Sequence, residues 1–185
     1  MRNRLASTLA LMGVLFLLPS GVARAQQFET GVYYLGPRVW LGNLNGAVAI
    51  GGQIERGFTE PGRYGPGIIS GGVGIDWYSW SYDYNILGNA YSYDYTVVPV
   101  QIFGHYHFVI EKNRKLDPYA GLAFVYSHVS ASSSGPGFGS YSASGSTSDI
   151  AGDVGVRYFM SPKFSVYGQL GFGYGTLGLG ASWKI

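Results

Sequence analysis

Two histidines separated by one residue are the first side chains in this sequence whose types and spacing could do chemistry. His105 and His107 lie in a stretch where polar and apolar residues alternate, so both imidazoles point to one face of an extended strand. Two imidazoles on one face can bind one metal ion, and Glu111 shares that face. No further ligands cluster nearby in the sequence, and we favour hydrogen-bonded packing beside Gln101. We therefore expect no metal and no cofactor.

The stretch Ser127-His128-Val129-Ser130 is the second candidate. It combines an imidazole with hydroxyl groups, which are the residue types of a serine nucleophile and its general base. Such a pair also needs a carboxylate that orients the imidazole, yet no Asp or Glu occurs between Asp117 and Asp149. Asp149 could take that place only if the chain between folds back. The alternative is a histidine at the edge of a serine-rich loop.

Strands are the elements that must position these residues, because the dominant pattern along the chain has a period of two. Most of the alternating segments are about 9–15 residues long, whereas globular strands average about five or six and membrane-spanning strands about 9–11. The segments are 31–42, 46–58, 67–80, 96–111, 117–129, 147–160, 163–174 and 177–185. We predict an all-β fold, an eight-stranded antiparallel up-and-down transmembrane β-barrel, closed because a free edge in lipid leaves backbone groups unpaired.

The composition agrees with a barrel and excludes several other classes. Hydrophobic residues make up 46% of the 185 residues and charged residues only 12%, against about 25% charged in soluble domains. The 30 glycines and 16 tyrosines argue against a helical bundle. The absence of cysteine excludes a disulfide scaffold and a thiol nucleophile.

The first 25 residues predict a secretory signal peptide. Arg2 and Arg4 precede the apolar run 5–18, and Ala23-Arg24-Ala25 is a cleavage site of the A-x-A type. The run is shorter than the roughly 20 residues of a spanning helix. We expect cleavage after Ala25 and a barrel domain over 26–185. Loss of the three arginines changes the formal charge from +2 to −1, which leaves no sign of nucleic-acid binding.

The polar face of each strand carries only one or two charges among small residues, which suits a crowded lumen better than a water-exposed surface. A soluble barrel of the lipocalin type is the alternative, but it needs a charged exterior. Equal numbers of acidic and basic groups can pair in a low-dielectric interior, so we predict a plugged lumen. The predicted lumen charges are Arg38, Glu55, Asp76, Asp153, Arg157 and Lys184.

Two long connections, 83–94 and 130–148, are predicted as loops, and the second is rich in Ser and Gly, which is typical of a mobile segment. Tyrosines cluster around the first of them. We interpret those at the strand ends, Tyr78, Trp80, Tyr82, Tyr84 and Tyr95, as an interfacial girdle. Tyr91 and Tyr93 fit either a girdle or a binding loop.

Four segments carry a family resemblance: VVPVQIFGHYHF, LDPYAGLAFVYS, DIAGDVGVRYFMSPKFSVYGQLGFGYG and LGLGASWKI. With them the chain resembles the small OmpA-like outer-membrane β-barrel proteins of Gram-negative bacteria. The resemblance implies an outer-membrane location among lipid and lipopolysaccharide, and an assembly machinery that reads the last strand. Gly180 and Trp183 match that assembly signal, and Ile185 stands where the family has Phe. We expect a monomer.

The family has no single activity, so the function stays open among alternatives. We favour a structural or surface-interaction role without catalysis. The pair His128 and Ser130 resembles the lipid A deacylase barrels, which implies His128 as base and Ser130 as nucleophile; the Glu that follows in those enzymes has no counterpart here. A conduit for small hydrophobic molecules is a further alternative, which needs an apolar path through the lumen.

Overall fold

The computed structural model describes residues 28–185 except 87–88, 111 and 136–137. Eight strands follow one another, each antiparallel to its neighbours, and β8 pairs with β1 to close the ring. The strands are β1 (Tyr33–Leu41), β2 (Ala49–Gly57), β3 (Ile68–Ile86), β4 (Asn89–His107), β5 (Leu116–Gly135), β6 (Phe138–Phe159), β7 (Phe164–Phe172) and β8 (Leu177–Lys184). The predicted eight-stranded antiparallel barrel is confirmed. The predicted signal peptide lies outside the described residues.

Helices play no part in the described portion of the chain, and so none there is long and apolar enough to cross a membrane.

The alternation of side chains separates an apolar exterior from a polar interior. Ile102, Leu122 and Ile150 point outward and are 63%, 63% and 64% exposed. Their neighbours Gln101 and Ala151 are buried. A continuous apolar surface of this kind suits a lipid environment.

Glycines in the wall give the large interior side chains their room. A Cβ atom at Gly74 would overlap the guanidinium of Arg38, and one at Gly180 would overlap the ring of Tyr167. Because every second residue of a strand points inward, any side chain at these positions would fill the same narrow lumen. The high glycine content therefore follows from the size of the interior groups.

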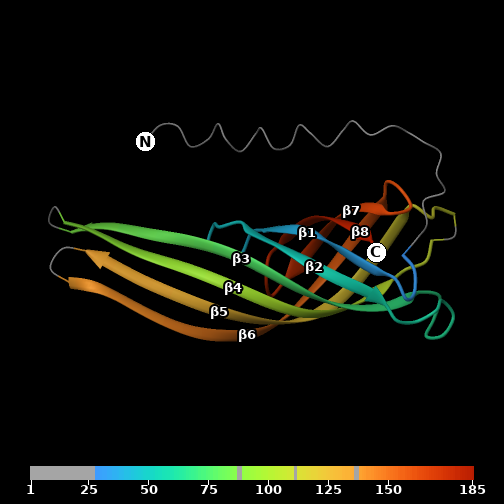
Figure 1. The fold of residues 1–185 in the computed structure, drawn as a ribbon, viewed down its shortest axis with the longest axis horizontal. Helices are drawn as coiled ribbons and strands as arrows, with labels where there is room; N and C mark the ends of the chain where they lie inside the picture. The colour runs from blue at the N-terminus through green and yellow to red at the C-terminus, as the bar shows by residue number, and fades with distance from the viewer. Residues whose placement is uncertain (1–27, 87–88, 111, 136–137) are drawn as a thin grey trace.

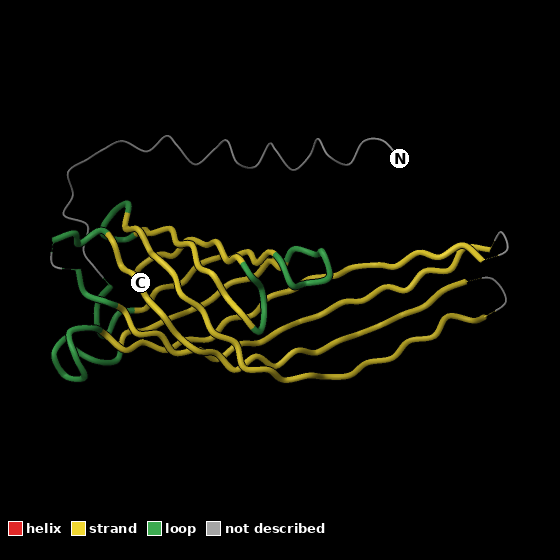
Figure 2. The backbone as a smooth tube through the Cα atoms, turned by 180° about the vertical axis from the view of Figure 1, so that it is seen from behind, coloured by secondary structure: helices red, strands yellow, loops and turns green. Residues whose placement is uncertain are grey.

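Four of the strands continue far beyond the barrel. Figure 1 shows β3 to β6 extending past the ends of the other strands, and Figure 2 shows the same extension from behind. We call this part, the described residues within 78–97 and 127–148, the projection. Pairing persists to its end, since β4 and β5 are in register as far as Ser92 and Ser134.

The prediction of loops at 83–94 and 130–148 is therefore wrong. The two segments form the outer halves of the β3–β4 and β5–β6 hairpins, joined by the β4–β5 ladder. Ser and Gly have low intrinsic strand preference, but that preference depends strongly on cross-strand neighbours. Here one hairpin supplies tyrosines and the other small residues, and the pairing continues outward with one register shift, between Ser133 and Gly135.

The connections at the other end of the barrel are 58–67, 108–115 and 160–163, and the C-terminus lies there as well (Figure 1). The first described residues, 28–31, also lie at this end, since Thr30 forms a bridge with Gly57. We call it the terminal end. The projection and the terminal end thus define two different openings of one lumen.

Candidate functional site

Two clusters of charged side chains with their hydrogen-bond partners lie in the described part of the lumen. The first surrounds Arg38, whose Nε and Nη2 each donate a 2.8 Å hydrogen bond to one oxygen of Asp76. Nη1 of Arg38 donates to Gln53 at 2.9 Å, and Gln101 donates to Asp76 at 3.0 Å. All four side chains are buried. A two-bond guanidinium–carboxylate pair is among the strongest protein ion pairs, and this one links β1 to β3 over Gly51 of the intervening strand β2.

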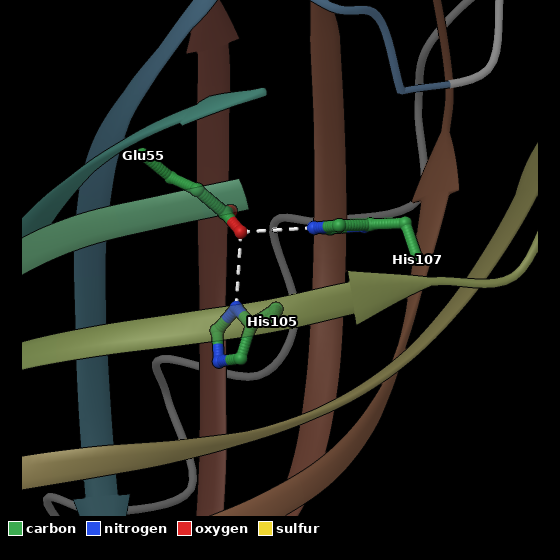
Figure 3. Close-up of side chains that lie close together, drawn as sticks. All are labelled: Glu55, His105 and His107. Atoms are coloured by element: carbon green, nitrogen blue, oxygen red, sulfur yellow. Dashed lines mark hydrogen bonds and ion pairs between the residues drawn. The ribbon is translucent and has the colours of Figure 1, made fainter. Parts of the chain in front are cut away.

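The second cluster is centred on Glu55 of β2 (Figure 3). Its Oε1 lies 2.9 Å from Nδ1 of His105, 3.0 Å from Nε2 of His107 and 2.7 Å from Oγ of Ser70. Its Oε2 accepts a 2.5 Å hydrogen bond from Arg157. The strand register brings these residues together, because Ser70 of β3 is the cross-strand partner of His105. We call these residues, with Asp117 and Asp153, the Glu55 cluster.

The outer nitrogens of the two imidazoles also face carboxylates. Nδ1 of His107 lies 2.9 Å from both oxygens of Asp117, and Nε2 of His105 lies 3.3 and 3.4 Å from the oxygens of Asp153. An ionised carboxylate can only accept hydrogen bonds, so with all three carboxylates ionised this arrangement calls for a proton on both nitrogens of each ring. Two imidazolium ions and Arg157 then balance the three carboxylates of the cluster.

Aromatic rings pack against this cluster at the terminal end. The ring of Phe28 lies parallel to that of His107, with centroids 3.7 Å apart, and 4.5 Å from that of Tyr34. The Arg157 guanidinium carbon lies 5.1 Å from the Phe28 centroid and 5.3 Å from that of Tyr34, which is cation–π geometry. Glu29 forms an ion pair with Lys184 at the rim.

The lumen charges predicted from the sequence fall at three places. Arg38 and Asp76 form the first cluster, and Glu55, Arg157 and Asp153 belong to the second. Lys184 lies at the rim and is only partly buried. The prediction did not connect the histidines with Glu55, because that needs the register across three strands. It also left out Asp117, the first residue of the predicted segment 117–129. Glu111 lies outside the described residues.

The structure separates His128 and Ser130 from the acid that the sequence suggested. Both point outward from β5, on the same face as Leu122 and Phe124, whereas Asp149 of β6 is the register partner of the inward-facing Val125. Among the described residues, His128 has no hydrogen bond or ion pair with a carboxylate. Asp149 therefore does not orient His128, because the direct pairing of β5 with β6 keeps Asp149 beside Val125 on the inward face.

Stacked aromatic rings run along one face of the projection. Trp80 stacks on Tyr78 at 5.8 Å and on Tyr95 at 5.0 Å, and Tyr84 meets Tyr93 edge to face at 5.8 Å. We call these rings the aromatic ladder; its members are Tyr78, Trp80, Tyr82, Tyr84, Tyr93 and Tyr95.

The aromatic ladder is not a girdle against lipid, so that interpretation is wrong. By alternation these rings share the face of Asp76, which points into the lumen. Tyr91, the register partner of Tyr84, shares that face too. The outward aromatic residues are others, such as Trp77 and Tyr126, 46% and 47% exposed. The inward position of these rings could have been predicted from the sequence by counting every second residue of the strand from Asp76.

The predicted assembly signal occupies the end of β8. Trp183 is 47% exposed on the outer surface and packs against Phe164, with ring centroids 5.0 Å apart. Ile185 is 67% exposed, and Gly180 faces the interior beside Tyr167. The last strand thus presents its large residues to the outside of the barrel.

Comparison with known proteins shows the fold. A designed transmembrane β-barrel superposes with a TM-score of 0.56 at 14% identity over 86% of this chain and all of that one. The N-terminal β-barrel domain of Pseudomonas aeruginosa OprF gives 0.56 at 12% identity, over 84% and 98% of the two chains. Ail, the attachment invasion locus protein of Yersinia pestis, gives 0.50 at 16%, over 83% and 95%. No protein-family model and no curated protein matches the sequence.

Proposed function

We propose that this chain is an outer-membrane β-barrel protein with a closed lumen and no catalytic activity, and that it acts through contacts made by the projection. The projection carries this proposal, because four paired strands continue beyond the barrel and present the aromatic ladder on one face. Tyr82, Tyr84 and Tyr93 are 46%, 52% and 44% exposed, and aromatic side chains of this kind are enriched in protein interfaces.

The direction of the projection follows from the way such barrels are built. Outer-membrane barrels have long extracellular hairpins and short periplasmic turns. The β3–β4 and β5–β6 hairpins are the long ones, and they extend on the side opposite to the terminal end. In this orientation the aromatic ladder faces the outside of the cell, and Phe28 faces the periplasm.

Cysteine labelling in a Gram-negative host tests the location and the orientation. The chain has no cysteine, so Ser133→Cys in the projection and Lys163→Cys at the terminal end each provide one site. A membrane-impermeant maleimide should label the first variant on intact cells and the second only after the outer membrane is permeabilised. The reverse pattern would place the projection in the periplasm and contradict the proposal.

Host cells that carry the protein in their outer membrane also test the role of the aromatic ladder. Replacing Tyr82, Tyr84 and Tyr93 together by serine should reduce cell–cell aggregation roughly tenfold, because exposed aromatic residues contribute most of the energy at such contacts. The matched control is Ser130→Ala with Ser132→Ala on the opposite face, which should leave aggregation unchanged. Equal aggregation by the tyrosine variant, at equal surface labelling, would contradict the role.

Planar bilayers test the closed lumen. The buried Arg38 and Asp76 pair occupies part of the interior, and Trp40, Leu44 and Tyr174 pack at the opening below the projection. We expect the refolded protein to show no large, stable single-channel conductance. Replacing both Arg38 and Asp76 by serine should introduce measurable conductance, since it removes the side chains that fill this level of the lumen. A large steady conductance of the unmodified protein would contradict a plugged lumen.

A further inference from the structure

The three side chains at the centre of the Glu55 cluster converge on one point. Nδ1 of His105, Nε2 of His107 and Oε1 of Glu55 all lie within 4.8 Å of one another, and all three residues are buried. Figure 3 shows the two rings approaching the same carboxylate oxygen from different directions. Ser70 Oγ lies 2.7 Å from that oxygen and 3.0 Å from Nε2 of His107. Two imidazole nitrogens and two oxygens thus surround a small volume.

The spacing of these atoms is close to that of a tetrahedral metal site. Zinc binds nitrogen and oxygen at about 2.0–2.2 Å, which sets neighbouring ligand atoms about 3.3 Å apart. The distances from Oε1 of Glu55 to the two nitrogens are 2.9 and 3.0 Å. An ion in place of the ring protons therefore requires Oε1 of Glu55 to move away from each nitrogen by only a few tenths of an ångström, and the two nitrogens lie within 4.8 Å of each other.

The surrounding residues hold the ligands as the outer shell of a metal site does. A histidine that binds a metal almost always donates its other ring N–H to a carboxylate, carbonyl or water. Asp117 accepts from Nδ1 of His107, and Asp153 lies against Nε2 of His105. Arg157 occupies only Oε2 of Glu55 and leaves Oε1 for the ion.

The charge of the cluster also fits a divalent ion. With neutral imidazoles, the ion and Arg157 together balance the carboxylates of Glu55, Asp117 and Asp153. The ion carries the same charge as the two ring protons that it replaces, so the buried cluster stays neutral in both states. Neutrality matters because an unbalanced charge in a low-dielectric interior is strongly unfavourable.

We propose that the Glu55 cluster is a binding site for one zinc-class divalent ion, held by Glu55, His105 and His107 with the Ser70 hydroxyl in the fourth position. Imidazole with carboxylate suits zinc and its neighbours rather than magnesium or calcium, which prefer oxygen ligands alone. The site lies behind Phe28 at the terminal end, so the ion enters from that end or during folding. The proposal does not depend on the role of the projection.

Metal analysis of refolded protein tests the site. Untagged protein is refolded in detergent with zinc chloride, desalted, and measured for zinc by mass spectrometry. We expect about one zinc per chain in the unmodified protein, and less than about a tenth of that in His105→Gln and His107→Gln. The matched control is His128→Gln, which removes the third histidine of the chain, on the outer face of β5, and should retain full binding.

Two results would overturn the proposal. One is unmodified protein without zinc after desalting; the other is zinc that is lost in His128→Gln and kept in the lumen variants, which marks surface binding. Folding is checked in every sample by the mobility shift on SDS gels before and after boiling. Should the lumen variants not fold, cobalt bound to the unmodified protein decides: intense visible absorption indicates the four-coordinate site, and weak six-coordinate absorption contradicts it.

Discussion

Replacing Arg157 by methionine should lower the free energy of unfolding by about 3–5 kcal/mol, the cost of leaving a buried charge without its partner. Arg157 is 1% exposed and donates to Oε2 of Glu55 at 2.5 Å. Methionine fills a similar length but carries no charge. The variant therefore leaves three carboxylates facing two imidazolium ions in the interior.

Part of that loss comes from the aromatic rings rather than from the ion pair. The guanidinium carbon of Arg157 lies 5.8 Å from the ring centroid of Tyr119 and 5.6 Å from that of Tyr167, in addition to Phe28 and Tyr34. Its Nε and Nη1 have no hydrogen-bond acceptor among the described residues, so the faces of these rings are their main partners. Arg157→Lys keeps the charge but loses the planar stacking, and should fall between the methionine variant and the unmodified protein.

Urea unfolding of protein refolded in phospholipid vesicles measures this effect, with gel mobility reporting the folded fraction. The matched control is Arg56→Met, an exposed arginine that hydrogen-bonds the Tyr33 hydroxyl, and its replacement should cost less than about 1 kcal/mol. Combining Arg157→Met with Glu55→Met should cost less than the sum of the two, because the charges are removed together. Additive losses would show that Arg157 does not act through Glu55.

Strand phase explains why much of the interior could be predicted from the sequence. Arg38, Glu55, Asp76 and Arg157 all fall on the sparsely charged face of an alternating strand, and all four are buried. What alternation cannot provide is the register between strands. Glu55 and His105 are fifty residues apart, and they meet because β2, β3 and β4 pair in one particular alignment. A shift by one residue would turn one of them outward.

The projection was missed for a different reason. Turn signals depend on composition, and the serine-rich segment 130–148 has the composition of a mobile connection. Its structure depends on partners elsewhere in the chain, since Tyr93 and Tyr95 lie opposite Ser133 and Ala131. Small residues beside large rings make a strand pair that neither segment indicates alone.

Replacing Gly36 by alanine should prevent stable folding, with a loss on the order of 3 kcal/mol or more, at the upper end of what overpacking costs. A Cβ atom at Gly36 would overlap the carbonyl oxygen of Ala181 and lie 2.8 Å from Cα of Ser182. Both belong to the backbone of β8, so no change of rotamer can relieve the overlap. The strain falls on the seam between β1 and β8, which closes the barrel.

Gly104→Ala is the matched control, because it adds the same methyl group to a strand glycine with space around it. The nearest atom to a Cβ there is the carbonyl oxygen of Ser70, at an ordinary contact distance of 3.6 Å. The methyl group restricts the backbone of the unfolded chain, so Gly104→Ala should raise the free energy of unfolding by about 0.4–1 kcal/mol. This change has the opposite sign from that of Gly36→Ala. The folded fraction after refolding into vesicles, read from the mobility shift on boiling, compares the two. Equal yields would mean that β1 can move away from β8, and that closure of the barrel does not depend on the close approach at Gly36.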